Sequence, residues 1–247
     1  MAGITDKLNF ALPDGHLMNH VLPFIEGAGI AFEGYEKENL NKRPPSMMLI
    51  SENAKEAIKD PERVTVKVIR PQDMPTQVAN ANFDIAISGV DWLTEHKLRF
   101  PKSPIMELLP LGFGKVRIVA AVHKDKWKDD FTEFMKSFKE SSNEPYLKIA
   151  SEYVYIADHF AIKRNLHPYR IIMTYGATES LIPEDCDMIV ENTETGNTLR
   201  KNNLEILDTI MHSEGCLIIS KKSLEIPWKK DLIMGINKVF NDYLTLV

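Results

Sequence analysis

Short apolar runs alternate along this chain with segments that carry apolar residues at helical spacing. Residues 8–12 have the character of a strand, closed by Pro13-Asp14-Gly15, and residues 16–27 place Leu17, Val21, Phe24 and Ile25 on one helical face. Strands that alternate with helices are typical of sheets in which neighbouring strands run parallel. The sequence therefore predicts an α/β fold built from βαβ units.

The same alternation continues to the end of the chain. Further strands are expected at 47–50, 64–69, 83–88, 105–111, 115–122, 148–151, 170–174 and 187–190. Helices are expected at 52–59, 73–81 and 125–138 and from Pro227 onward. Residues 204–211 and 216–220 flank Ser213-Glu214-Gly215, and we expect them to form a hairpin.

Two prolines near residue 104 interrupt this rhythm, which indicates a boundary between two βαβ lobes. We expect residues 1–104 and 197–247 to form the first lobe and residues 105–196 to form the second. A cleft between two lobes is a common place for a ligand.

Composition and charge exclude several classes of protein. The longest apolar runs have the length of strands, far below the roughly 20 residues that span a bilayer, and no secretory signal is visible. We therefore expect a cytoplasmic protein in which Cys186 and Cys216 are buried thiols. The net charge of −5, with dispersed lysines, argues against nucleic acid as a partner.

The strongest local candidate for a binding site follows the strand expected at 187–190. Gly196 permits a tight turn, Thr195 and Thr198 carry hydroxyl groups, and a helix start next to Asn197 would direct backbone N–H groups at a phosphate. Glu191 and Glu194 have oxygens suited to ribose hydroxyls or magnesium. The alternative is a turn in which the threonines only cap a helix.

Other polar groups follow the expected strands of the first lobe. Arg70 and Asp73 lie where a strand meets a helix limited by prolines, and Ser88 and Asp91 follow the next strand. The alternative for Arg70 and Asp73 is an exposed ion pair of little energetic weight. His16 has a second histidine four residues later, but no third metal ligand with a recognisable spacing accompanies them, so no metal site is assigned.

Taken together, these segments resemble the catalytic chain of the ATP phosphoribosyltransferase family. The resemblance extends nearly end to end, and its strongest parts are Arg70-Pro71-Gln72-Asp73-Met74-Pro75, residues 84–91, residues 109–117, Gly176-Ala177-Thr178-Glu179 and Glu194-Thr195-Gly196-Asn197-Thr198-Leu199-Arg200. It implies two lobes of the periplasmic-binding-protein type. It also implies that the threonine-rich turn holds the 5-phosphate of phosphoribosyl pyrophosphate.

The resemblance implies a reaction as well. Adenine N1 of ATP would attack the anomeric carbon of the ribose while pyrophosphate leaves, with Mg²⁺ assisting, as the first step of histidine biosynthesis. The chain is similar to the short form of the family, which implies an oligomer with a regulatory subunit resembling a histidyl-tRNA synthetase. The expected nucleotide contacts are Asp14, His16, Arg70, Asp73, Ser88, Asp91, Glu152 and Tyr175.

The chain differs from the usual family pattern at three places. Asp14-Gly15-His16 stands where Lys-Gly-Arg is typical, Glu152 occupies a basic position, and Glu191 replaces an aspartate. Two other interpretations therefore stay open: a paralogue with a different nucleophile or donor, and a protein that binds a small ligand without a reaction.

Overall fold

The computed structural model describes residues 6–44, 46–128, 130–141 and 144–246, and these form two compact units. Unit 1 is drawn from Met1–Leu93, Lys102–Gly114 and Glu214–Val247, and unit 2 from Thr94–Pro101 and Lys115–Ser213. The chain therefore passes between the units more than once. These units assign residues 105–114 to unit 1 and residues 94–101 and 197–213 to unit 2, which differs from the expected lobes 1–104 with 197–247 and 105–196.

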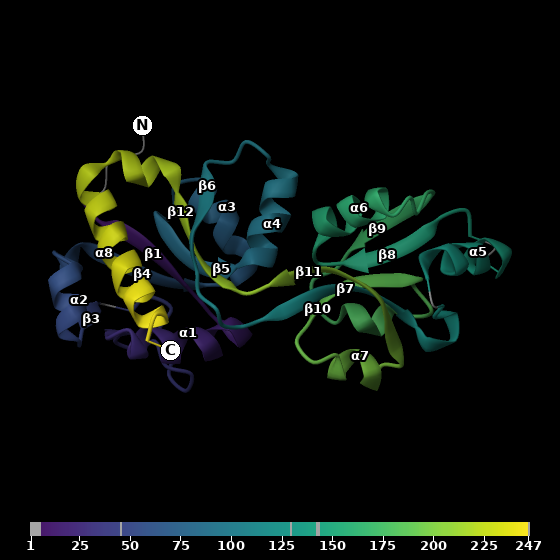
Figure 1. The fold of residues 1–247 in the computed structure, drawn as a ribbon, viewed down its shortest axis with the longest axis horizontal. Helices are drawn as coiled ribbons and strands as arrows, with labels where there is room; N and C mark the ends of the chain where they lie inside the picture. The colour runs from purple at the N-terminus through teal and green to yellow at the C-terminus, as the bar shows by residue number, and fades with distance from the viewer. Residues whose placement is uncertain (1–5, 45, 129, 142–143, 247) are drawn as a thin grey trace. The chain divides into compact units, whose positions relative to one another are not determined.

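Unit 1 contains a five-stranded sheet in the order β4-β1-β5-β12-β6 (Figure 1). Its strands are β1 (Leu8–Pro13), β4 (Val64–Ile69), β5 (Ile85–Gly89), β6 (Ile105–Pro110) and β12 (Gly215–Ser220). The first three are parallel to one another, whereas β12 is antiparallel to both β5 and β6. The carboxyl ends of β1, β4 and β5 therefore meet at one edge of the sheet.

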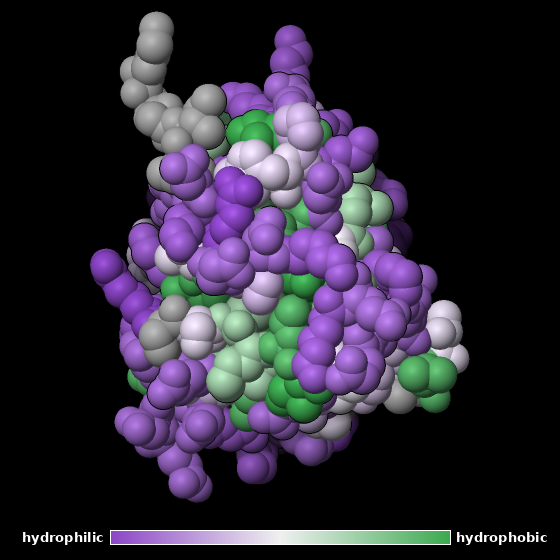
Figure 2. All heavy atoms as spheres, turned by 90° about the vertical axis from the view of Figure 1, so that its left-hand side faces the viewer, coloured by the Kyte–Doolittle hydropathy of each residue, from purple (hydrophilic) through white to green (hydrophobic). Residues whose placement is uncertain are grey.

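Helices and a small hairpin complete unit 1. They are α1 (Gly15–Gly27), α2 (Glu52–Ala57), α3 (Met74–Ala79), α8 (Pro227–Leu244), and β2 (Ile30–Phe32) paired with β3 (Met47–Leu49). Apolar residues of α1, including Val21 and Ile25, pack with β1 and α8 in one continuous core. Figure 2 shows a mostly hydrophilic face of the molecule on which some hydrophobic side chains stay exposed. No helix among the described residues is long and apolar enough to cross a membrane.

A buried ion pair fastens the last helix of unit 1 to the sheet. Lys229 Nζ lies 2.7 Å from Asp84 Oδ1 and 2.9 Å from Oδ2. The Ser223 hydroxyl and the backbone N–H of Asn9 donate to the same carboxylate, at 2.6 and 2.8 Å. Both charged groups are buried, and burial of an unpaired charge costs much free energy. Each group of the pair offsets part of this cost for the other.

Unit 2 contains a second five-stranded sheet, in the order β11-β7-β10-β8-β9. Its strands are β7 (Val116–His123), β8 (Leu147–Ser151), β9 (Tyr169–Met173), β10 (Met188–Thr193) and β11 (Leu204–Ser213). Its helices are α5 (Phe131–Ser141), α6 (Val154–Lys163) and α7 (Asn197–Lys201), while α4 (Val90–Arg99) begins in unit 1 and ends in unit 2. Strands β8, β9 and β10 are parallel, so their carboxyl ends also share an edge.

The prediction of a hairpin from residues 204–211 and 216–220 is wrong. Strand β11 pairs with β7 in unit 2, whereas β12 pairs with β5 and β6 in unit 1. Both edges of β12 are occupied by these partners, so no edge is left for β11. The expected helix at 125–138 also begins later, at Phe131, after a short 3-10 turn at Lys124–Lys126.

The two cysteines agree with the prediction from sequence. Cys186 lies in unit 2 and Cys216 in unit 1, both are buried, and no disulfide joins them. Burial is the main cause that raises the pKa of the Cys186 thiol to about 12, so this thiol stays protonated.

Candidate functional site

The turn at residues 193–198, called here the threonine turn, connects β10 to α7 in unit 2. Gly196 has φ +76°, in the left-handed region that glycine adopts without steric cost. Its backbone N–H donates to Thr193 Oγ1 at 2.9 Å, which closes the turn from inside. The first helical residue, Asn197, follows directly.

The outer side of the threonine turn carries polar groups that point to solvent. Thr195 and Thr198 are exposed, and the Thr198 hydroxyl has no hydrogen bond to any described residue. Arg200 donates to the backbone oxygen of Thr195 at 3.1 Å and to Asn197 Oδ1 at 2.6 Å. The guanidinium group of Arg200 is therefore held against the turn. The sequence analysis did not include Arg200 among the candidate site residues.

A pocket of about 420 Å³ lies beside the threonine turn, entirely within unit 2. Four of its lining residues are acidic: Glu152, Glu179, Glu191 and Glu194. Glu152 follows β8, which is next to β10 in the sheet, so it reaches the same edge as Glu191. The structure thus brings the expected residues Glu152, Glu191 and Glu194 together.

The carboxyl group of Glu191 has a shifted pKa in this pocket. Burial is the main cause that raises its pKa to about 7, and the nearby charges of Glu152 and Glu179 act in the same direction. Hydrogen bonds from Asn192 and Thr178 oppose the shift. Near neutral pH this carboxyl therefore exists in both protonation states, and its protonated form can donate a hydrogen bond.

Polar contacts join the elements next to the pocket. The Ser151 hydroxyl donates to the backbone oxygen of Val190 at 2.6 Å and accepts from the N–H of Tyr153 at 2.8 Å. The Tyr153 hydroxyl in turn accepts from Asn192 Nδ2 at 3.0 Å. These bonds join β8, β10 and the start of α6, and Tyr153 is a supporting residue that local sequence patterns did not reveal.

The other expected site residues lie mostly at the carboxyl edge of the sheet in unit 1. Asp14 follows β1, and Lys42 places its ammonium group 2.6 Å from Asp14 Oδ2. Arg70 follows β4, is exposed, and makes no side-chain hydrogen bond or ion pair with the described residues. The expected alternative of an Arg70–Asp73 ion pair is therefore absent from the described part of the chain.

Two further residues at this edge are buried. The Ser88 hydroxyl donates to the backbone oxygen of Pro71 at 3.0 Å, which joins β5 to the turn after β4. The Asp91 side chain lies over Gly89, where an added Cβ would come within 2.0 Å of Asp91 Oδ1. Gly89 is therefore required for this close approach.

The remaining expected site residues are exposed. His16 and Asp73 are exposed in unit 1, and Tyr175 is 87% exposed in unit 2.

The donor groups of the described residues do not form a protein-held metal site. No cluster of three or more His, Cys, Asp or Glu residues in the described ranges has an arrangement suited to a metal ion. His16 and His20 have ring centroids 5.3 Å apart in an edge-to-face contact.

The fold defines a class: a two-unit α/β protein of the periplasmic-binding-protein type. A protein from Candida albicans, described as having the generic periplasmic binding protein fold, superposes with TM-score 0.55 and 9% identity, over 97% of this chain and 71% of that one. The ATP phosphoribosyl transferase (HisG:HisZ) complex from Thermotoga maritima contains a chain that matches with TM-score 0.69 and 22% identity, over 97% of this chain and 100% of that one.

Sequence comparison then identifies the family. The family model described as HisG, ATP phosphoribosyltransferase, matches residues 70–241. The ATP phosphoribosyltransferase of Chlorobaculum parvum is 30% identical over 94% of this chain and 70% of its own length. The chain belongs to the ATP phosphoribosyltransferase family, and its function is the phosphoribosyl transfer that begins histidine biosynthesis.

Proposed function

We propose that the threonine turn holds the 5-phosphate of phosphoribosyl pyrophosphate while the ribosyl group is transferred to adenine N1 of ATP. The observation that supports this role is the left-handed Gly196, which turns the exposed Thr195 and Thr198 toward solvent at the start of α7. Hydroxyl donors of this kind suit phosphate oxygens.

Charge in the pocket decides how well a phosphate can bind. At about 4 Å and an effective dielectric near 20, two like unit charges repel by about 4 kcal/mol, so four ionised glutamates would oppose a phosphate dianion strongly. The guanidinium of Arg200 at the turn offsets part of this repulsion. Protonation of Glu191 removes another part, since its pKa is about 7.

The reaction itself requires alignment more than covalent help from the protein. Adenine N1 forms a bond to the anomeric carbon while the bond to pyrophosphate breaks, and pyrophosphate leaves with the electron pair. In this proposal, Glu191 and Glu194 bind ribose hydroxyls. The proposed nucleotide contacts are Asp14, His16, Arg70, Asp73, Ser88 and Asp91 in unit 1, and Glu152 and Tyr175 in unit 2.

Arg70 is the best placed of these groups for an anionic ligand. It is an exposed cation at the carboxyl edge of the sheet, and no described side chain neutralises it. Lys42 adds a second cation at this edge, although Asp14 neutralises part of its charge. Both would favour the phosphate groups of a nucleotide.

Mg²⁺ fits this proposal as a companion of the substrate rather than a resident cofactor. The described residues do not form a metal-binding cluster, whereas pyrophosphate oxygens bind Mg²⁺ well. We also propose a cytoplasmic location and a complex with a regulatory subunit, since the Thermotoga maritima relative is part of a HisG:HisZ complex.

The first test is direct assay of the reaction. The protein is incubated with ATP, phosphoribosyl pyrophosphate and Mg²⁺, with and without the cognate regulatory subunit, and the phosphoribosylated ATP is measured by mass spectrometry. Product whose formation requires both substrates is the expected result. Persistent lack of product with the regulatory subunit present would contradict the proposal.

The second test addresses the site. Thr195→Val and Thr198→Val remove hydroxyl donors and are expected to weaken ribose 5-phosphate binding by about tenfold each, measured by calorimetry. Thr132→Val, at an exposed position of α5 in the same unit, is the matched control and should bind normally. Equal affinity in all three variants would show that the phosphate binds elsewhere.

A further inference from the structure

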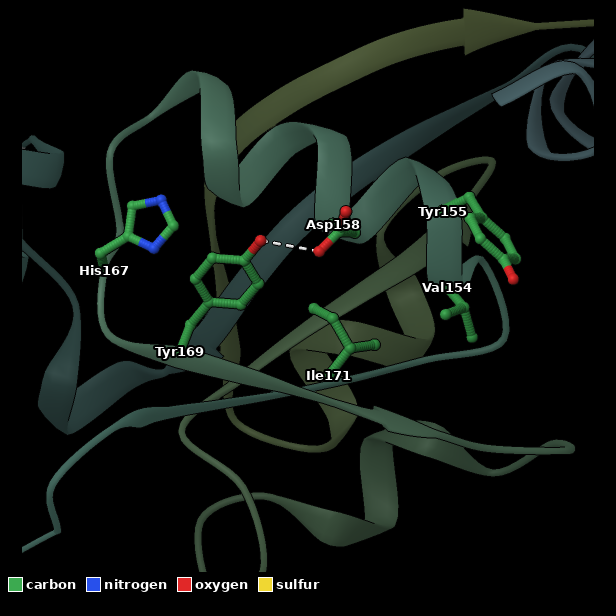
Figure 3. Close-up of a pocket in the computed structure, with 6 residues that line it drawn as sticks. All are labelled: Val154, Tyr155, Asp158, His167, Tyr169 and Ile171. Atoms are coloured by element: carbon green, nitrogen blue, oxygen red, sulfur yellow. Dashed lines mark hydrogen bonds between the residues drawn. The ribbon is translucent and has the colours of Figure 1, made fainter. Parts of the chain in front are cut away.

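A second pocket in unit 2 shares no lining residue with the pocket beside the threonine turn. It has a volume of about 560 Å³ and lies along α6 and β9, between Val154, Tyr155, Asp158, His167, Tyr169 and Ile171. Strand β9 is at the edge of its sheet, so this pocket opens beside a strand with only one neighbour. Figure 3 shows Asp158 between Tyr169 and Tyr155, with Ile171 and Val154 nearby.

The central polar group of this pocket is a half-buried carboxylate with no ion-pair partner among the described residues. The Tyr169 hydroxyl donates to Asp158 Oδ1 at 2.7 Å, and no donor in the described part of the chain is bonded to Oδ2. Burial and the contact with Asp158 raise the pKa of Tyr169 to about 12, so the hydroxyl stays protonated and keeps donating. A partly buried carboxylate with one neutral donor is favourably placed to pair with a positive charge.

The surrounding rings also favour a cation. Tyr155 and Tyr169 line the pocket, and His167 lies with its ring centroid 5.1 Å from that of Tyr169. A cation already lies beside one of these rings, because the Arg99 guanidinium is 5.4 Å from the Tyr155 ring centroid. No lysine or arginine among the described residues lines the pocket, which makes it poorly suited to phosphate or another anion.

We propose that the α6–β9 pocket binds a primary ammonium or guanidinium group carried on a short aliphatic stem. The cation pairs with Asp158, the tyrosine rings flank it, and Val154 and Ile171 contact the stem. The group belongs either to a free amine or to a lysine or arginine side chain of another polypeptide. Asp158 is then the residue that selects for positive charge.

The test is a titration of the whole ¹⁵N-labelled 247-residue chain followed by NMR. Cadaverine is the ammonium probe, agmatine adds a guanidinium group, and 1,5-pentanediol is the uncharged analogue of cadaverine. Both amines are expected to give saturable shifts of the backbone amides around Asp158 and Tyr169, and the diol is not. Equal binding of the diol, or no saturable shifts with either amine, would overturn the proposal.

Two variants distinguish the effect of the Asp158 charge from the effect of a negative charge elsewhere on unit 2. Asp158→Asn keeps an oxygen acceptor for Tyr169 and is expected to weaken cadaverine binding by about tenfold or more. Glu133→Gln removes one negative charge from an exposed position of α5 and should leave binding unchanged. Circular dichroism checks that both variants fold, and equal weakening in both would contradict a specific role for Asp158.

The source of the cation is resolved by comparing probes. A blocked peptide Gly-Gly-Lys-Gly-Gly that binds more tightly than cadaverine would support a polypeptide side chain, whereas weaker binding would support a free amine. The same peptide with norleucine in place of lysine should not bind. If the norleucine peptide binds as well as the lysine peptide, the pocket does not recognise positive charge and the proposal is wrong.

Discussion

Replacement of Lys229 by methionine removes the charge that neutralises Asp84 while it preserves most of the aliphatic stem. In the wild-type protein both side chains are buried, with relative exposures of 8% and 9%. After the change, Asp84 keeps two neutral donors, Ser223 and the N–H of Asn9, and loses its only ion-pair partner among the described residues.

The expected magnitude follows from these contacts. At roughly 3 Å and an effective dielectric of about 20, two opposite unit charges attract by about 6 kcal/mol, and the desolvation of lysine offsets part of this. Removal of one partner of a buried pair typically costs about 3–5 kcal/mol. Because two hydrogen bonds to Asp84 remain, we expect Lys229→Met to lower the free energy of unfolding by about 3 kcal/mol.

Urea unfolding followed by circular dichroism measures this loss, with separate transitions fitted if the two units unfold apart. The matched control is Lys238→Met on the same helix, whose ion pair with Asp242 is exposed and is expected to contribute little to stability. Adding Asp84→Asn to Lys229→Met should recover part of the loss, because no buried charge remains. A loss below about 1 kcal/mol in Lys229→Met would refute the reasoning.

Three further predictions concern unit 2. Gly196→Val forces a branched residue to φ +76° and should weaken ribose 5-phosphate binding at least tenfold in calorimetry. The circular dichroism spectrum should stay normal, and unchanged affinity would argue against the turn as the site. The pKa of Glu191 is raised to about 7, so this carboxyl gains negative charge as pH rises through 7 and phosphate binding should weaken. Glu191→Gln should flatten this part of the calorimetric pH profile, and an identical profile in the variant would be contrary evidence. Glu95 accepts from the N–H groups of Tyr155 and Ile156, each at 2.8 Å, at the start of α6. Glu95→Ala should therefore cost about 1–3 kcal/mol in urea unfolding, and a loss under about 0.5 kcal/mol would show that this cap contributes little.

The raised pKa of Glu191 also has a defined effect on stability. An unfolded glutamate ionises near pH 4.5, whereas folded Glu191 ionises near 7, so the folded state binds more protons between these values. The contribution of this group to stability is therefore greatest below about pH 4.5 and declines as pH rises to about 7. Glu191→Gln should remove this decline from the unfolding free energy.

Local patterns in the sequence were sufficient for most strands and helices and for the threonine turn. Apolar spacing depends only on neighbouring residues, so it indicated β1, β4, β5 and β10 close to their observed positions. The need for glycine at residue 196 is also local, because it arises from a single backbone dihedral. The three-residue strand β2 was missed, since so short a run carries little periodicity.

Tertiary structure alone decided which distant groups meet. Asp84 and Lys229 are 145 residues apart in the chain, and Lys42 reaches Asp14 across 28 residues. The pairing of β12 with β5 and β6, rather than with β11, depends on which sheet edges are available. Glu152 perturbs Glu191 only because β8 and β10 are neighbours in the sheet. The sequence by itself therefore determined most of the elements and the residue types of the turn, whereas packing determined the charges around it, because electrostatic coupling depends on distance in space.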